Sequence, residues 1–429
     1  MKKVLIITYY WPPSGGAGVQ RWLKYARYLL DCGIQPVVVT VDPLQASYPV
    51  IDNSLLYEIP AAVKVHTTDT YEPFEVYRII SRKKQIPFAG FANEGKVTFF
   101  KKFVRFIRGN LFIPDARKGW NKFAFKKCCE LIEKENIDTI LVTSPPQSSQ
   151  LIGLQLKKKY QLKWIADIRD PWTDIYYYDK LLHTNWAKKT DLRYEREVLE
   201  NADKIIVVSN SIKKMFVQKS SKILEDKIHV IPNGFDENDF KIKAPEAGPD
   251  FVITYTGTIT GDYKIEAFVR ALKQLIENNR QTKIKLRFVG SVSGDIKGIL
   301  EKNLKFNSEI IPHVAHAESV KYLMSSSLLL LAIPDVKDNK GILTGKLFEY
   351  LASQKLILCL GPSDGEAAEI LRECKAGNTC DYDAENEIFT SLQASFTEWK
   401  NGNELRGATE KYKKYSRQIQ AKEISEIVG

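Results

Sequence analysis

The sequence has no long apolar run. None of its 429 residues falls in a stretch approaching the ~18 consecutive apolar residues that a membrane-spanning helix needs. The opening Lys2–Ile7 has the charge order of a signal peptide, but its apolar part is short and no small-residue cleavage site follows. We therefore expect a buried first strand and a cytoplasmic protein.

Cysteine and histidine are few and scattered. The six cysteines show no Cys-x-x-Cys spacing, which in a chain of this size predicts free thiols in a reducing compartment. Among the five histidines only His313 and His316 are three positions apart, without a third ligand nearby. The sequence predicts no metal site, and no Ser-His-Asp or Cys-His arrangement can be identified.

Positive charge is concentrated in one segment. The net charge is +11, and residues 94–127 hold ten Lys or Arg against two acids, with many aromatic side chains between them. Nucleic acid, anionic lipid and an anionic substrate could each be attracted. Because no nucleic-acid-binding signature accompanies the charge, we expect no nucleic-acid partner.

Residues 97–111 form a basic amphipathic pattern at helical spacing. One face carries apolar residues and the flanks carry cations: Phe100, Phe103, Val104, Ile107 and Leu111, against Lys101, Lys102, Arg105 and Arg108. Such a helix could rest on an anionic membrane surface, with its aromatic face in the headgroup region. It could equally bury that face in the domain core. Both interpretations stay open, and the first predicts peripheral association with the inner face of the cytoplasmic membrane.

Strand-like and helix-like segments alternate along the whole chain. In the first half, apolar runs typical of strands covered on both faces are Val4–Tyr9, Val37–Val41, Thr139–Thr143, Trp164–Ile168 and Ile205–Ser209. The pattern restarts with Val252–Thr256, Ile284–Val289, Leu328–Ile333 and Leu356–Leu360. Alternation of this kind predicts an α/β protein with parallel sheets wound on both sides.

The length predicts two domains of ~200 residues each. The turn Ile231–Asp236 and the polar segment Lys241–Asp250 mark the linker region. We expect an N-terminal domain over 1–235, a C-terminal domain over 236–405, and a charged helix over 406–429 that packs back on the first domain.

A glycine-rich turn follows the first strand. Gly15, Gly16 and Gly18 would let backbone N–H groups approach a ligand, and the helix start that follows favours an anion. Arg21, one turn into that helix, could reach an anionic group. The turn lacks the full Gly-x-Gly-x-x-Gly spacing, so a tight turn without a ligand and a solvated arginine are the alternatives.

The run Gly345–Leu358 carries the most informative pattern, and with the backbone near Thr344 its start could hold a diphosphate. A short amphipathic helix begins near Gly345 and Lys346, and Glu349 follows before a buried strand. A helix start suits a phosphate, and a nearby carboxylate accepts from sugar hydroxyls. Together with the first glycine-rich turn, this predicts a nucleotide sugar held in a cleft between two domains. A surface carboxylate paired with Lys346 is the alternative for Glu349.

Four segments together resemble glycosyltransferase family 4, whose members have the GT-B fold of two Rossmann-like domains facing across a cleft. The segments are Val4–Gly18, Val207–Ser211, Ile231–Asp236 and Lys346–Ala352. The resemblance implies that the first domain binds an acceptor and the second a nucleotide-diphosphate sugar, with Glu349 on the ribose. It also implies a retaining, metal-independent transfer to a glycan or lipid-linked acceptor, for surface polysaccharide biosynthesis, with no cofactor.

The sequence also departs from the family pattern. Gly341 stands where many relatives have a second glutamate, Thr258 replaces an arginine, and Lys264 lies one position late for a diphosphate lysine. Gly257 and Thr258 could still donate hydrogen bonds to the donor. No histidine ends the strand before Asp170, so the resemblance leaves Arg169 and Asp170 as catalytic candidates; an ion pair that locks this loop is the alternative.

Two other functions stay open at this point. A nucleotide-sugar 2-epimerase of the same fold would use the donor without an acceptor. The missing family residues would also fit a non-catalytic subunit that binds nucleotide sugars.

Overall fold

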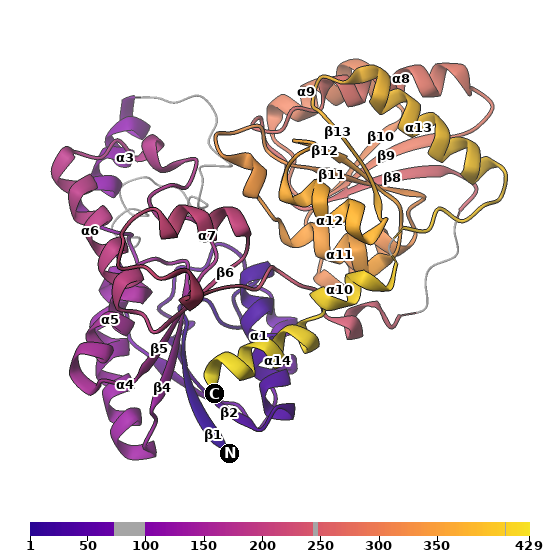
Figure 1. Ribbon diagram of the computed structural model, residues 1–429. Helices are drawn as coiled ribbons and strands as arrows, with labels where there is room; N and C mark the ends of the chain where they lie inside the picture. The colour runs from indigo at the N-terminus through magenta and orange to yellow at the C-terminus, as the bar shows by residue number, and fades with distance from the viewer. Residues whose placement is uncertain (73–98, 243–247, 408) are drawn as a thin grey trace. The chain divides into compact units, whose positions relative to one another are not determined.

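Two parallel sheets organise the chain in the computed structural model, which describes residues 1–72, 99–242, 248–407 and 409–429 (Figure 1). The chain divides into two units, Met1–Pro232 with Arg417–Gly429, and Asn233–Ser416. Within the described ranges, no helix is both long and apolar enough to cross a membrane. The expected linker segment Lys241–Asp250 falls inside the second unit, and residues 243–247 of it lie outside the described residues.

The first sheet has seven strands in the order β3-β2-β1-β4-β5-β6-β7, all paired in parallel. The strands are β1 Lys2–Ile7, β2 Ile34–Val41, β3 Lys64–Thr68, β4 Thr139–Ser144, β5 Lys163–Ile168, β6 Lys204–Val207 and β7 Ile228–Val230. The helices of this unit are α1 Ala17–Asp31, α3 Phe99–Leu111, α4 Asn121–Glu135, α5 Ser149–Tyr160, α6 Asn185–Asn201, α7 Asn210–Val217 and α14 Arg417–Val428.

Both faces of the first sheet are covered, which is why its central strands are mostly apolar. Successive side chains of a strand point to opposite faces. Val4 and Ile6 pack in one core with residues of α1 and α14, while Leu5 and Ile7 pack in another with α4 and α5. The two cores confirm the predicted doubly wound arrangement.

The second sheet repeats this architecture with six parallel strands in the order β10-β9-β8-β11-β12-β13. The strands are β8 Phe251–Thr256, β9 Ile284–Val289, β10 Ser308–Ile311, β11 Leu328–Ala332, β12 Ile357–Leu360 and β13 Gly377–Cys380. The helices are α8 Glu266–Asn278, α9 Gly294–Leu304, α10 His316–Met324, α11 Gly345–Ser353, α12 Glu366–Cys374 and α13 Glu385–Lys400.

The last helix belongs to the first unit. The residues that we expected to form one charged helix from 406 include the 3-10 helix η8, Glu410–Tyr415, in the second unit, and α14 in the first. α14 lies along α1 (Figure 1), and the Tyr25 hydroxyl donates to Gln420 Oε1 at 2.7 Å. The terminal backbone is held as well, because Lys2 Nζ and Lys163 Nζ each donate to the carbonyl of Val428 at 3.0 Å.

Each sheet has one point where the strand order reverses direction. In the first sheet it lies between β1 and β4, and in the second between β8 and β11. In open parallel sheets, ligands bind beyond the carboxyl ends of the strands at such a point. The loops after β1, β4, β8 and β11 are therefore the places to look for a site in each unit.

Candidate active site

The start of α11 lies at the strand reversal of the second sheet, directly after the loop that follows β11. Thr344 is its N-cap with extended backbone (φ −78°, ψ 151°), and its side chain makes no capping hydrogen bond. The buried Oγ1 of Thr344 has no partner among the described residues. A helix start also leaves backbone N–H groups of its first turn, including Gly345 and Lys346, without intrahelical partners. The arrangement offers several donors to one anion.

Lys346 lies against Gly257, which follows β8. Gly257 has φ +95°, which favours glycine, and a Cβ placed there would be 2.7 Å from Lys346 Cε, so a side chain would displace the end of the lysine. The Lys346 ammonium is 5.1 Å from the ring centroid of Tyr255, a buried residue of β8. A cation is thus fixed over the end of β8, within the loop cluster that includes the start of α11.

Thr258 and Lys264 lie in the same loop with different surroundings. Thr258 is exposed, and its carbonyl accepts from the Tyr255 hydroxyl at 2.8 Å. Lys264 is half-exposed and its Nζ is 2.7 Å from Asp335 Oδ2, a contact that raises the pKa of the lysine. The ammonium of Lys264 is therefore already paired, and an anionic ligand would have to compete with Asp335 for it.

Glu349 lies one turn into α11 and is not part of the apolar core. Its neighbours Leu347, Phe348, Tyr350 and Leu351 are fully buried, whereas the Glu349 side chain keeps 17% of its surface exposed. Glu349 Oε1 is 3.9 Å from Nδ1 of His316, the first residue of α10. The carboxylate thus remains accessible beside an imidazole.

The glycine-rich turn of the first unit positions an arginine. Gly16 has φ +104°, which glycine tolerates without strain. A Cβ on Gly18 would be 2.2 Å from Arg169 Nη1, so the absence of a side chain at Gly18 makes room for the guanidinium. Gly15 is packed against Val50 on the other side of the turn, where a Cβ would be 2.9 Å from Val50 Cγ1.

Arg169 and Asp170 follow β5, so three loops of the first unit converge: those after β1, β4 and β5. Arg169 Nε donates to the carbonyl of Ser144, at the end of β4, at 3.1 Å. Burial lowers the pKa of Arg169 and raises that of Asp170, and the neighbouring Arg169 partly offsets the rise. A cation and a carboxylate in poorly hydrated surroundings suit the binding of polar, charged groups.

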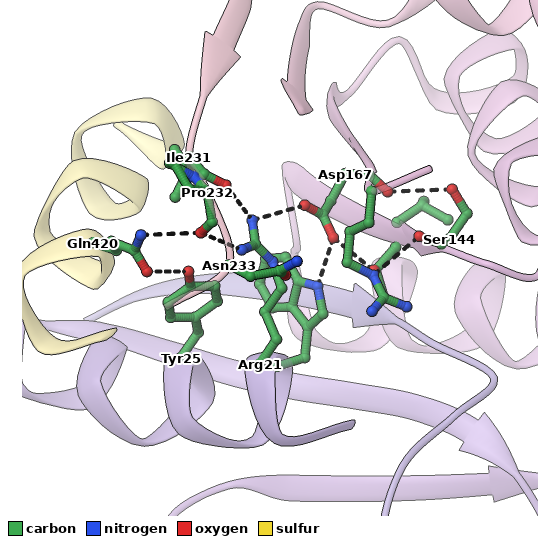
Figure 2. A network of polar contacts seen from close by, with 12 residues as sticks. Arg21, Tyr25, Ser144, Asp167, Ile231, Pro232, Asn233 and Gln420 are labelled. Carbon is green, nitrogen blue, oxygen red and sulfur yellow. Dashed lines mark hydrogen bonds and ion pairs between the residues drawn. The ribbon is translucent and has the colours of Figure 1, made fainter. Parts of the chain in front are cut away.

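Arg21 has a different role from the one predicted. Its side chain is 1% exposed and points into the unit, where Nη2 is 3.3 Å from Asp167 Oδ1 (Figure 2). The same guanidinium donates to the carbonyls of Ile231 at 3.0 Å and Pro232 at 2.8 Å. Arg21 therefore ties α1 to Ile231 and Pro232, which end the first of the unit's two chain segments. Its guanidinium is not available at the glycine-rich turn.

Asp167 holds this internal network together. Besides Arg21, its carboxylate accepts from Trp22 Nε1 at 2.7 Å and from the Thr143 hydroxyl at 2.6 Å, and its side chain is fully buried. Three donors satisfy the buried charge, as burial of a carboxylate requires. The network joins α1, β4 and β5, and Asp167 lies in β5 two residues before Arg169.

A sequence model of one known family matches residues 15–239, just over half of the chain, and its description is Glycosyltransferase Family 4. The chain belongs to glycosyltransferase family 4. Among curated protein sequences there is no significant match.

Solved structures support the corresponding fold. Sucrose-phosphate synthase from Thermosynechococcus elongatus is similar with a TM-score of 0.60 and 14% identity, over 100% of this chain and 96% of that one. HepE from Anabaena, solved with UDP-glucose, has a TM-score of 0.55 and 12% identity, over 100% and 95% of the two chains. A structure from Listeria monocytogenes that is described as a putative UDP-N-acetylglucosamine 2-epimerase has a TM-score of 0.55 and 12% identity. The match covers 99% of this chain and 95% of that one. The fold of this family 4 chain is GT-B, as predicted.

Sequence reasoning missed His316 and Asp191 as partners of the expected site residues, and it missed the pairing of Asp167 with Arg21. Asp191 on α6 accepts from Trp172 Nε1 at 2.7 Å and from the Tyr178 hydroxyl at 2.9 Å, and so holds the loop that follows Asp170. His316 was noted only for its spacing from His313. Because these contacts join positions far apart in sequence, a local motif does not reveal them.

The described residues hold no group of three or more His, Cys, Asp or Glu side chains that could bind a metal ion. All six cysteines are free. Gly341, which replaces a glutamate of many family 4 relatives, ends the 3-10 helix η7, Asn339–Gly341, in the loop before α11.

Proposed function

We propose that this family 4 protein transfers a sugar from a nucleotide-diphosphate sugar to a hydroxyl of a glycan or lipid-linked acceptor, in surface polysaccharide biosynthesis. The observation that carries the proposal is the loop cluster at the strand reversal of the second sheet. There the unpaired Thr344 Oγ1, the start of α11 and the Lys346 ammonium come together, and Glu349 follows one turn later.

The diphosphate is proposed to bind at the start of α11. Backbone N–H groups at Gly345 and Lys346, the Thr344 hydroxyl and the helix dipole all favour negative charge. Gly257 and Thr258 would supply further donors from the facing loop. Lys264 would join only by exchanging Asp335, 2.7 Å away, for a phosphate oxygen.

Glu349 is proposed to accept hydrogen bonds from the ribose hydroxyls. An ionised carboxylate accepts two such bonds, and charge-assisted bonds are about twice as strong as neutral ones. Its 17% exposed side chain is accessible but sheltered, which strengthens each bond relative to bulk water.

In the first unit, Arg169 and Asp170 are the proposed catalytic residues that orient the transferred sugar or the acceptor hydroxyl. Bond cleavage at the anomeric carbon places positive charge on the sugar and negative charge on the leaving diphosphate, so fixed dipoles and cations at the diphosphate stabilise the transition state. We further propose retention of anomeric configuration, without a metal or another cofactor. Gly15, Gly16 and Gly18 would line the acceptor or phosphate loop.

The test begins with a thermal-shift panel of UDP and GDP sugars, followed by a release assay for free nucleotide with a mixture of glycan and lipid-linked acceptors. Glu349→Ala should weaken nucleotide binding by at least about tenfold in calorimetry, since one hydrogen bond to a charged group contributes about 1.5–3 kcal/mol. Its melting temperature should stay near that of the wild type. Glu318→Gln, an exposed change in the first turn of α10, is the control. Unchanged affinity in Glu349→Ala would refute the proposed donor site.

An epimerase is the second candidate, because a structure of similar fold is described as one. It would convert the nucleotide sugar without an acceptor, and NMR of the sugar product separates the two activities. Binding of nucleotide sugars without turnover in either assay would instead identify a non-catalytic subunit.

We also propose peripheral association with an anionic membrane surface through α3. Val97 lies outside the described residues, as do the side chains of residues 99–101. Further along the helix, Phe103 is 53% exposed, Phe106 45% and Leu111 73%, while Val104 and Ile107 are half-buried. The exposed residues would enter the headgroup region, and the exposed Lys102 of the same helix would face anionic lipid.

A neighbouring segment extends this surface. Asn110 Nδ2 donates to the carbonyl of Leu182 at 3.1 Å and Asn110 Oδ1 accepts from the Thr184 backbone at 2.7 Å, so α3 is tied to the start of α6. Leu182 is 45% and Trp186 67% exposed. Lys188 and Lys189, also exposed, add positive charge.

Co-sedimentation with vesicles of phosphatidylcholine, with and without phosphatidylglycerol, tests this part. We expect binding only to the anionic vesicles, reduced at least about tenfold in Phe103→Ala/Trp186→Ala, since full burial of one aromatic contributes about 1.5–3 kcal/mol and both side chains are already partly buried. Phe306→Ala removes an aromatic of the second unit that is even more exposed, at 89%, and should bind as the wild type does. Failure to pellet at any salt concentration would contradict the proposal.

A further inference from the structure

Three side chains from different elements of the second unit meet beside α11. Asp239 comes from the 3-10 helix η6, Glu237–Phe240, His316 from the first turn of α10, and Glu349 from α11. His316 Nε2 is 3.2 Å from Asp239 Oδ2, and His316 Nδ1 is 3.9 Å from Glu349 Oε1. Each ring nitrogen of the histidine thus faces a carboxylate.

From this geometry we infer that His316 is a positioning residue that fixes the Glu349 carboxylate for the nucleotide, and that Asp239 orients the imidazole. The inference rests on the proposed donor site at Glu349. It adds two residues outside α11, His316 and Asp239, which would hold the Glu349 carboxylate in its orientation.

The two ring nitrogens of His316 have different partners. A hydrogen bond at one ring nitrogen of a histidine fixes the orientation and proton position of the other. With Asp239 accepting from Nε2–H, the ring plane is set and Nδ1 is turned toward Glu349, but in the neutral ring Nδ1 is an acceptor and cannot donate to that carboxylate. When both nitrogens carry protons, the imidazolium attracts the two carboxylates at once and holds Glu349 Oε1 on its own side.

Partial burial makes the arrangement effective. The exposed fractions are 21% for His316, 16% for Asp239 and 17% for Glu349, so solvent screens these contacts less than it screens surface pairs. Glu349 has three side-chain torsions, and a free carboxylate would lose more conformational entropy on binding ribose than a held one. Holding the carboxylate in advance therefore raises affinity for the nucleoside part of the ligand alone.

Because Glu349 would contact only the nucleoside part, the experiment compares two nucleotides with a probe that lacks a nucleoside. The probes in calorimetry are uridine diphosphate, guanosine diphosphate and inorganic pyrophosphate. We expect His316→Gln to weaken whichever nucleotide binds by about three- to tenfold and to leave pyrophosphate binding within twofold of the wild type. Asp239→Asn should act in the same direction with a smaller effect. Glu318→Gln, a charge removal in the same turn of α10, should change neither.

A double-mutant cycle separates positioning from independent contributions. If His316 acts through Glu349, adding His316→Gln to Glu349→Gln should weaken nucleotide binding by less than twofold further. Multiplicative effects would overturn the inference, as would equal losses of nucleotide and pyrophosphate binding in His316→Gln. If Glu349→Gln itself leaves nucleotide binding unchanged, or the wild type binds neither nucleotide, the proposed donor site fails. If Glu349→Gln weakens binding and His316→Gln does not, only the role of His316 is refuted.

Discussion

At the residue scale, the position of Arg169 depends on the absence of a Cβ at Gly18, 151 positions earlier in the sequence. Gly18 lies in α1, yet it is not needed there for an unusual backbone conformation. Its value is the space it leaves for the Arg169 guanidinium, whose Nε is held by the Ser144 carbonyl. The glycine-rich turn thus shapes the first unit's loops by steric fit as well as by backbone freedom.

Gly18→Ala should therefore lower activity more than stability. The added methyl would be 2.2 Å from Arg169 Nη1, and the flexible end of the arginine would have to move away. Alanine favours a helix over glycine by about 1 kcal/mol, which offsets the cost of that movement. We expect a melting temperature within a few degrees of the wild type and a turnover number reduced at least tenfold.

The matched control is Gly298→Ala in α9, where an added Cβ has no neighbour within 4 Å. It makes the same chemical change without touching a candidate residue, so its turnover should equal that of the wild type. If Gly18→Ala retains full activity, the location of the Arg169 guanidinium does not matter to the reaction.

At the element scale, α6 holds the loop that follows β5. Asp191 accepts from Trp172 and Tyr178, and in the next turn the Glu195 carboxylate accepts from the Thr173 hydroxyl at 2.5 Å. Two buried carboxylates of one helix therefore fix the loop that carries Arg169 and Asp170 at its start. Both carboxyl groups, Asp191 and Glu195, lie in poorly hydrated surroundings, which raises their pKa values.

Asp191→Asn should remove a pH dependence of stability. Burial raises the pKa of Asp191 from 3.8 to about 7, so the folded state binds the proton more tightly than the unfolded state does. Stability contributed by this group is therefore lost as the pH rises from about 4 to about 7, at about 1.4 kcal/mol per unit of pKa difference.

Melting curves between pH 4 and 8 measure this effect. The decrease in stability with rising pH should be smaller in Asp191→Asn, which keeps a polar group near Trp172 and Tyr178. Parallel profiles of wild type and variant would mean that Asp191 titrates normally in the folded protein.

At the scale of the whole molecule, the helix that ends the chain completes the first unit. Ala421, Ile424 and Val428 are fully buried against the core that α1 covers, although the α14 sequence is rich in charge. The unit therefore needs residues from both ends of the chain before its sheet is fully covered.

Ile424→Ala should destabilise the first unit by about 2–5 kcal/mol, the usual cost of truncating a buried isoleucine. Ile419 lies in the same helix and is 36% exposed, so Ile419→Ala should cost less than 1 kcal/mol. Chemical denaturation of both variants measures the difference. Equal effects would contradict the burial of α14 against this core.

Much of the fold could be predicted from the sequence, because the central strands are apolar on both faces. The edge strands β3, β7, β10 and β13 were not predicted, since an edge strand is covered less and keeps polar residues, such as Lys64 and His66 in β3. The expected helix over 97–111 corresponds to α3, which begins at Phe99 in the described residues.

The candidate site was predictable only as far as local patterns reach. Thr344, Gly345 and Lys346 follow from the pattern of a helix start, and the structure brings Gly257 to Lys346. Arg21 showed the limit, because its partners Asp167, Ile231 and Pro232 lie more than 140 positions away. A side chain that looks solvated along the sequence can be buried by residues that no local pattern connects to it.

The path of the backbone gives the second unit the character of an insertion. The chain enters it after Pro232 and leaves it before Arg417, so it is tethered at two points to a unit assembled from both termini. A single proteolytic nick at either junction would leave the second unit covalently attached to the first-unit residues on the uncut side, while the packing of α14 against α1 would hold the two fragments together. Circular permutants that open the chain inside the second unit would keep Met1–Pro232 and Arg417–Gly429 as one continuous polypeptide once the native ends are linked.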